Sequence, residues 1–181
     1  MTLRILTLAT LFPNPASPNF GIFVERQTAE LSGRPQTSVT VINPIGIPLW
    51  PFSKHKKYQR LSAVPEHHQW RGLDVHRPRF RLVPRFGGAS NPQRIADALL
   101  PLVEKLYRKT PFDVIDSEFF YPDGPAAMRL ADALDIPFTI KARGADIHHW
   151  GSEPKCRAQI LEAAEEASAL LAVSEALKQD M

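Results

Sequence analysis

Short apolar runs alternate with longer segments of helical periodicity along most of the chain. The apolar runs are rich in β-forming residues and predict strands at 3–9, 38–43, 113–116, 136–141 and 168–173, the first of them buried. Apolar positions at helical spacing predict helices at 22–31, 123–134 and 153–167, one that begins at 91, and a last one after Ser174. This alternation predicts a mainly parallel sheet with helices on both faces, a Rossmann-like three-layer α/β/α fold.

Local signals refine some of these elements. Asn91 followed by Pro92 is typical of a helix start, with an N-cap residue and a proline at the first helical position. Pro101 is expected to kink or divide that helix, because proline lacks the N–H that helix hydrogen bonding requires. Residues 44–90 contain many prolines and are expected to be irregular, with one strand near 74–80.

The composition is that of an ordinary soluble globular domain. The 181 residues suit a single domain spanning 1–181, and 44% of them are hydrophobic. The lone cysteine, Cys156, excludes a disulfide framework and a multi-cysteine metal site, and we expect it to be buried and inert. No segment has the pattern of a signal peptide or a membrane span. A cytoplasmic location is therefore expected.

Positive charge is concentrated between residues 54 and 85. This stretch holds nine Lys and Arg residues against two acids, Glu66 and Asp74, and aromatic residues lie within and beside it. Two interpretations are open: a solvated loop region, or a face for an anionic lipid, an anionic acceptor or nucleic acid. No fold signature of nucleic-acid binding accompanies the charge, so we expect no nucleic-acid partner.

In an open parallel sheet, ligands bind at the carboxyl ends of the strands, which selects three loops. The first covers 13–21 and ends in Phe20 and Gly21, where a glycine lets the backbone approach a ligand closely. The second contains Glu118, Tyr121 and Asp123. Asp123 is expected either to cap the helix it precedes or to bind a ligand, whereas Glu118 lies at a strand end that faces the crevice.

The third loop carries Arg143, Gly144 and Asp146, followed by His148 and His149. Arg143 is a candidate contact for a phosphate or an acceptor, and Asp146 is expected either to bind hydroxyl groups or to hold the loop. Adjacent histidines point apart on most backbones and no third ligand is evident nearby, so we predict no metal site.

Four motifs in this order resemble the glycosyltransferase 4-like family of retaining GT-B glycosyltransferases. The matching segments cover nearly the whole chain: Phe12-Pro13-Asn14-Pro15 with Gly21-Ile22-Phe23-Val24-Glu25-Arg26-Gln27, Tyr121-Pro122-Asp123-Gly124, Ile136-Pro137-Phe138 with Arg143-Gly144-Ala145-Asp146, and Ala172-Val173-Ser174-Glu175-Ala176-Leu177. Two positions depart from the pattern, because many relatives carry histidine where Glu118 and Arg143 stand.

The resemblance implies that 1–181 is the acceptor-side N-terminal domain of such an enzyme. The second Rossmann domain, which would bind most of the nucleotide-sugar donor and supply a pair of glutamates, is absent from this chain. The resemblance further implies hexosyl transfer with retention, in polysaccharide biosynthesis, to a glycan or lipid-linked acceptor, without a cofactor or metal. The expected substrate-binding residues are Phe20, Gly21, Glu118, Tyr121, Asp123, Arg143, Gly144 and Asp146, with Glu118 as the catalytic candidate.

Further expectations concern the membrane and the alternative functions. The basic region 54–85 is expected to contact the inner face of the membrane peripherally, and the domain alone is expected to be inactive. The alternative is a stand-alone, non-catalytic Rossmann-like domain that binds a nucleotide or a protein. An NAD-dependent oxidoreductase is disfavoured, because no GxGxxG fingerprint follows the first strand.

Overall fold

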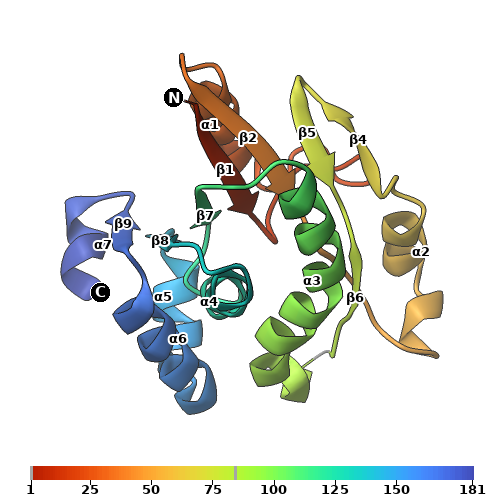
Figure 1. Cartoon of the computed structure of the whole chain (residues 1–181). Helices are drawn as coiled ribbons and strands as arrows, with labels where there is room; N and C mark the ends of the chain where they lie inside the picture. Colours follow the sequence, from red (N-terminus) through yellow and green to blue (C-terminus); the bar gives the residue numbers. More distant parts are fainter. Residues whose placement is uncertain (1, 84) are drawn as a thin grey trace.

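The computed structural model describes residues 2–83 and 85–181. Within these residues one sheet of seven strands has the order β4-β5-β2-β1-β7-β8-β9 (Figure 1). All neighbouring strands pair in parallel except β4, which is antiparallel to β5. The strands are β1 (Leu3–Leu8), β2 (Thr37–Ile42), β4 (His67–Trp70), β5 (Leu73–His76), β7 (Val114–Ser117), β8 (Phe138–Ala142) and β9 (Ala169–Ala172).

Helices cover both faces of this sheet, which confirms the predicted fold class. Helix α1 (Ile22–Ser32) packs on one face, where Val24 joins Ile5 and Val41 in a buried cluster. On the other face lie α3 (Asn91–Lys109), α4 (Asp123–Leu134) and α6 (Pro154–Glu166). The alternation of side chains along β1 explains the two layers, because Ile5 and Leu6 point to opposite faces.

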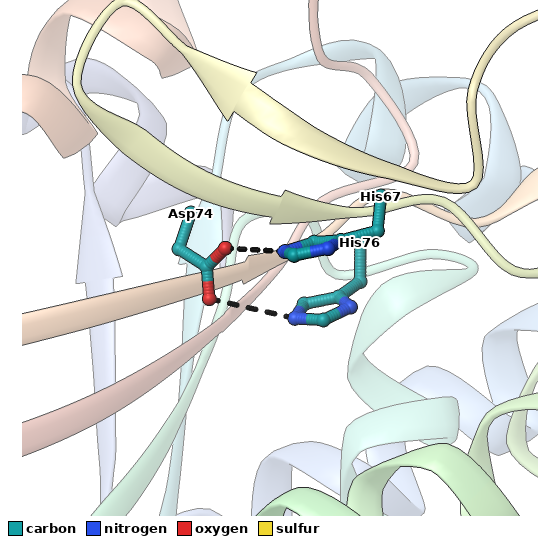
Figure 2. A group of neighbouring side chains, drawn as sticks. All are labelled: His67, Asp74 and His76. Carbon is teal, nitrogen blue, oxygen red and sulfur yellow. Dashed lines mark hydrogen bonds and ion pairs between the residues drawn. The ribbon is translucent and has the colours of Figure 1, made fainter.

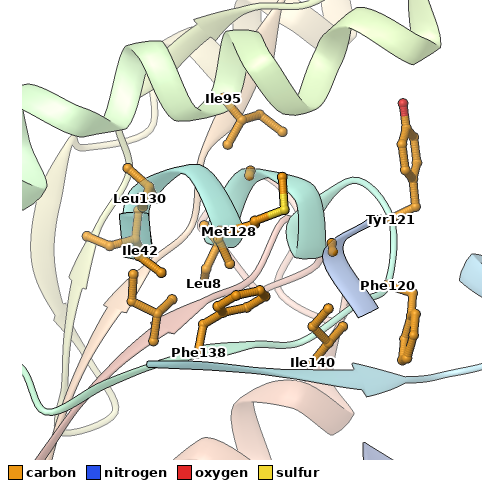
Figure 3. Close-up of a cluster of buried hydrophobic side chains, with 14 of the residues drawn as sticks. Leu8, Ile42, Ile95, Phe120, Tyr121, Met128, Leu130, Phe138 and Ile140 are labelled. Atoms are coloured by element: carbon orange, nitrogen blue, oxygen red, sulfur yellow. The ribbon is translucent and has the colours of Figure 1, made fainter. Parts of the chain in front are cut away.

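The larger core fills the space between α3, α4 and the strands. Figure 3 shows Ile95 of α3, Leu130 of α4 and Ile140 of β8 in this cluster. Cys156 on α6 is also buried here, as predicted. The last helix, α7 (Glu175–Asp180), starts as expected with Ser174 as N-cap, whose hydroxyl accepts a hydrogen bond from the N–H of Leu177 at 3.2 Å.

Residues 44–90 are more regular than the sequence predicts. The single strand expected near 74–80 is wrong: β5 ends at His76, and after Arg77-Pro78 a separate strand β6 (Arg79–Arg81) pairs with β3 (Ile45–Ile47) in a second sheet. This region also contains helix α2 (Lys56–Ser62) and the short 3₁₀ helices at Phe52–Lys54 and Arg85–Ser90.

Three helix details also differ from expectation. Ser90 rather than Asn91 is the N-cap of α3, and Asn91 Oδ1 instead accepts a hydrogen bond from the N–H of Val83 at 3.3 Å. Pro101 does not divide α3, which continues to Lys109, with Leu99 and Val103 on either side of the proline fully buried. Asp123 is the first residue of α4 and does not cap it, because its carboxylate is used elsewhere.

The order of the strands places the site. The connection from β1 runs through α1 to β2 on one side of β1, whereas β7 and β8 lie on the other side. Strand order therefore reverses between β1 and β7, and the crevice beyond their carboxyl ends is where open α/β sheets bind ligands. In the part of the chain that the structure describes, no helix has the length and apolar character needed to span a bilayer.

Candidate functional site

A cavity of about 630 Å³ lies beyond the carboxyl ends of β1 and β2. The loop after β1 forms one wall with Phe20 and the hydroxyl and amide groups of three polar residues, Thr10, Asn14 and Ser17. Asn43, which follows β2, is held in place by a 2.8 Å hydrogen bond from its Nδ2 to the carbonyl of Ala9. The cavity therefore combines hydrogen-bonding groups with an aromatic face, as small-molecule sites commonly do.

The opposite wall of the cavity is basic. Helix α2 contributes Lys56, Lys57 and Arg60, all exposed, together with His55 at its N-terminus. Some of the cations of the 54–85 stretch therefore line a cavity and do not lie in a solvated loop. Pro84 and the side chain of Arg85, the end of that stretch, lie outside what the structure describes.

Other cations of the same stretch are structural. Arg77 is completely buried, and burial lowers the pKa of its guanidinium to about 10. Its Nη2 donates to the carbonyl of Pro13 at 2.8 Å, and its Nη1 lies 3.0 Å from His68 Nδ1. Arg77 thus fastens the loop after β1 to the end of β5.

A network of buried charges occupies the junction of β7 and β8, on the face of the sheet that carries α1. Lys141 Nζ lies 2.5 Å from Asp116 Oδ2 and 2.7 Å from Glu118 Oε1. The second oxygen of Glu118 accepts a hydrogen bond from Arg143, and Thr139 donates to Asp116 at 2.9 Å. Glu118 is only 1% exposed, so it is held between two cations rather than presented to the crevice as a free carboxylate.

Arg143 links this network to helix α1. Its Nη2 donates to Gln27 Oε1 at 2.6 Å, and its guanidinium lies over the ring of Phe23, 5.3 Å from the centroid. Phe23 is in the first turn of α1, where the leading N–H groups of a helix have no partner within the helix. A guanidinium therefore lies beside a helix N-terminus, and both features favour an anion.

Asp146 holds the loop after β8. Its two carboxylate oxygens accept hydrogen bonds from the N–H groups of Gly144 at 2.7 Å, Arg143 at 3.0 Å and Phe120 at 2.8 Å. Gly144 has a φ of 118°, which a residue with a side chain rarely adopts. Of the two roles expected for Asp146, the geometry supports loop positioning, because its oxygens are already occupied by backbone donors.

Asp123 connects α4 to the end of β1. Its Oδ2 accepts a hydrogen bond from the N–H of Thr10 at 3.0 Å, while its buried Oδ1 has no partner among the described residues. Burial raises the pKa of this carboxyl to about 8, and the nearby Glu118 and Asp146 contribute in the same direction. The Asp123 carboxyl therefore holds its proton to a higher pH than an exposed aspartate, and it is fixed under the loop that forms the cavity wall.

The backbone conformation and the crowded surroundings of position 21 require a glycine. Gly21 has a φ of 74°, and a Cβ at this position would lie 2.7 Å from the backbone of Leu11. Its close approach is thus to the preceding loop, and approach to a ligand stays a prediction. Phe20, next to it, is half exposed and lines the cavity.

Tyr121 lies apart from the other predicted site residues. Its side chain is buried against Trp150, with ring centroids 5.1 Å apart, and its hydroxyl donates to the carbonyl of Gly88 at 2.6 Å. Burial raises the pKa of the phenol well above its usual range. The structure thus places Tyr121 in the core (Figure 3). His148 and His149 do not converge on a common point: His148 pairs with Asp180 at 3.6 Å, and His149 packs on Trp150.

The structure thus brings together Glu118, Arg143, Gly144 and Asp146 at one end of the crevice and connects Asp123 to its floor. Sequence reasoning missed the partnership of Lys141 with Asp116. Its signal was available, because both residues alternate with buried apolar neighbours on adjacent strands and so point to the same face.

Comparisons with known proteins agree with this architecture. No model of a protein family matches the chain. The chain is 30% identical to a Bacillus subtilis (strain 168) protein assigned as the glycosyltransferase TuaC of teichuronic acid biosynthesis, over 98% of this chain and 46% of that protein. The chain therefore spans about half the length of this curated relative.

Two solved structures show a similar fold at low sequence identity. The N-terminal domain of trehalose-6-phosphate phosphatase from Candida albicans has a TM-score of 0.59 at 12% identity, over 99% of this chain and 42% of that one. UDP-GlcNAc 2-epimerase from Neisseria meningitidis, bound to UDP-GlcNAc, has a TM-score of 0.55 at 14% identity, over 99% of this chain and 42% of that one. The chain thus has a Rossmann-like fold that matches part of each of these two structures, and its sequence is similar to that of a protein assigned as a glycosyltransferase.

Proposed function

We propose that the chain is the acceptor-side N-terminal domain of a retaining glycosyltransferase, which transfers a hexosyl group from a nucleotide-sugar to an anionic glycan or lipid-linked acceptor. The observation that carries this proposal is the cavity beyond β1 and β2, with polar and aromatic groups on one wall and the cations of α2 on the other. The sequence relative, which is assigned to the synthesis of teichuronic acid, supports an acidic product.

The two walls of the cavity have complementary tasks in this proposal. The hydroxyls of Thr10 and Ser17 would bind the hydroxyl groups of the acceptor sugar. Lys57 and Arg60 would bind its carboxylate or phosphate, and these cations also attract an anionic acceptor to the cavity before it docks.

The donor would approach the other end of the crevice. Arg143 and the N-terminus of α1 would stabilise the negative charge that develops on the nucleoside diphosphate as it leaves. Most of the contacts to the nucleotide would come from a second Rossmann domain. Glu118 and Lys141 would then act as positioning residues, because they fix Arg143 and the end of β8. Both carboxylate oxygens of Glu118 already accept hydrogen bonds from cations, so Glu118 would not act as a general base.

The first test measures binding by the chain itself. We expect a uronic-acid disaccharide to bind more tightly than its neutral counterpart, and Arg60→Glu to remove most of this difference. Arg34→Glu, an exposed cation just after α1, is the matched control that should leave binding unchanged. Equal binding of both disaccharides, or tight binding of NAD⁺ instead, would contradict the proposal.

The second test asks whether the domain is half of an enzyme. The source reading frame beyond the codon for Met181 should encode a second βαβ series. The longer protein should transfer sugar from a nucleotide-sugar to an acidic acceptor, whereas residues 1–181 alone should not. Conversion of UDP-GlcNAc in the absence of any acceptor would instead favour an epimerase.

A peripheral membrane contact is part of this proposal. Leu49, Trp50 and Phe52 are all more than half exposed, although they are apolar. They directly precede the cations of α2, and this combination of aromatic and basic side chains is typical of segments that lie at an anionic bilayer surface. Such a contact would present the cavity to a lipid-linked acceptor on the inner face of the membrane.

A further inference from the structure

The hairpin of β4 and β5, at the edge of the sheet, brings together three side chains that are potential metal ligands. In its antiparallel register His67 lies opposite His76, and Gln69 lies opposite Asp74. Asp74 and His76 are two residues apart on one strand, so their side chains point to the same face, which His67 shares. Each of the three residues offers one ligand atom, and among the described residues these three atoms all lie within 4.8 Å of one another.

The two imidazoles are arranged around a single carboxylate. Figure 2 shows the rings of His67 and His76 stacked, with their centroids 4.1 Å apart, and both presenting a nitrogen to Asp74. His67 Nε2 lies 2.6 Å from Asp74 Oδ1, and His76 Nε2 lies 3.5 Å from Asp74 Oδ2. Ligands at about 2.0–2.2 Å from a tetrahedral ion lie roughly 3.3–3.6 Å apart. The three ligand atoms lie within 4.8 Å of one another, so they are near this spacing, and one ring would turn from the stacked arrangement to bind the same ion.

His76 Nε2 is buried and only weakly paired. Its residue is 9% exposed, and its Nε2 makes no hydrogen bond among the described residues, with only the 3.5 Å ion-pair contact to Asp74. A buried polar atom without a hydrogen bond is costly, and this one points to the side of the hairpin where the other two ligand atoms lie.

We propose that His67, Asp74 and His76 form a binding site for a divalent transition-metal ion such as Zn(II). Two imidazoles and one carboxylate suit Zn(II) or Co(II), whereas Mg(II) and Ca(II) prefer sites made of oxygen ligands alone. His67 and Asp74 are partly exposed, so water can reach the ion and complete its coordination.

The ion would act as a clip on the edge of the sheet. It would join β4 to β5 through side chains. Strand β5 pairs with β2, and β2 ends beside the cavity proposed to bind the acceptor. The carbonyl of His76 accepts a hydrogen bond from the N–H of Asn43 at 2.8 Å, and Asn43 lines that cavity. Metal binding would therefore stabilise the hairpin and the position of Asn43. This role is independent of the transferase activity proposed above.

Direct titration tests the site. The untagged chain, freed of metal with a chelator, is titrated with Zn(II) by calorimetry and with Co(II) by absorption spectroscopy. We expect one ion per chain and the visible bands of four- or five-coordinate Co(II), without a thiolate charge-transfer band. Mg(II) at the same concentration should give no binding. Zn(II) should also raise the urea midpoint of unfolding, because it binds the folded chain.

Variants distinguish this site from adventitious binding. His67→Ala removes a ligand from an exposed position, and Asp74→Asn removes the carboxylate while keeping its shape, so both variants should fold. Each should weaken Zn(II) binding by more than about tenfold and abolish the shift in urea midpoint. His148→Ala, at an exposed histidine outside the hairpin, should change neither. An absence of Zn(II) binding, or binding that survives both hairpin substitutions, would overturn the proposal.

Discussion

Lys141 donates a hydrogen bond to Glu118 across the junction of β7 and β8, with 2.7 Å between Nζ and Oε1. Both side chains are more than nine-tenths buried, and Lys141 also binds Asp116. Buried ions are tolerated only when they are paired, so each of these charges depends on the others. The same network positions Arg143, and it thereby connects the stability of the sheet to the geometry of the crevice.

Substitution of Lys141 by Met should therefore be strongly destabilising. The variant keeps the length of the side chain but leaves Asp116 without its cation and Glu118 with Arg143 alone, and breaking a buried pair typically costs about 3–5 kcal/mol. The measurement is the free energy of unfolding from urea denaturation at pH 7. Lys178→Met is the control, because Lys178 pairs with Glu175 in solvent and should contribute little. Equal stability of the two variants would show that the network is not coupled in this way.

Gly21 and Gly72 provide a matched pair for backbone strain. Both have positive φ, 74° and 87°, but only at Gly21 would a Cβ collide with backbone, whereas nothing lies within 4 Å at Gly72. Gly72→Ala should cost about 1–2 kcal/mol from conformation alone. Gly21→Ala should cost about 1–3 kcal/mol more, because the loop and α1 must move apart. Denaturant unfolding of both variants measures the difference, and similar costs would contradict the predicted crowding.

The sequence predicts the strands and helices well where they carry a clear apolar pattern. Strands β1, β2, β7, β8 and β9 are short apolar runs bounded by turn residues, and α4 carries an apolar stripe of Ala127, Leu130 and Ala131. The loops after β1, β7 and β8 follow from these elements. Their residues could therefore be proposed as a site before the structure placed them together.

The hairpin of β4 and β5 and helix α2 could not be predicted in this way. β4 is polar, and the turn before β5 is Arg71-Gly72 rather than the Asn-Gly or Asp-Gly pair that signals a hairpin. Helix α2 has only seven residues and no buried one, so its apolar pattern is too short to predict a helix. The grouping of His67, Asp74 and His76 depends on the register of that hairpin, so it could not be predicted without the hairpin. The sequence instead draws attention to the adjacent pair His148 and His149, whose side chains have separate partners.

Trp50 and Phe52 should determine whether the chain binds to membranes. Replacing both by Ser removes two exposed aromatic side chains, each worth about 1.5–3 kcal/mol when buried, so binding to anionic vesicles should fall by more than tenfold. The measurement is co-sedimentation with phosphatidylglycerol vesicles at low and high salt. Leu161→Ser, at an exposed apolar residue of α6, is the control. Unchanged sedimentation of the double variant would exclude this segment as the contact.

Asp123 should make the stability of the domain depend on pH in a particular direction. The folded chain holds the carboxyl proton up to about pH 8, whereas the unfolded chain releases it near pH 4. Between these values the folded state binds more protons, so the contribution of Asp123 to stability falls as pH rises. Asp123→Asn removes this titration and can still accept the hydrogen bond from Thr10, so its stability relative to the wild type should increase steadily from pH 5 to pH 8.

Urea midpoints across this range measure that difference. The amide of the variant places two buried N–H groups where the protonated wild type has one O–H, and the described residues offer no partner there, so the variant should be the less stable of the two at pH 5. Asp132→Asn, at an exposed carboxylate on the same helix, should differ from the wild type by a constant amount over the same range. If Asp123→Asn also gave a constant difference, Asp123 would be ionised at neutral pH. The negative charge at the end of β1 would then oppose the approach of an anionic substrate to the crevice.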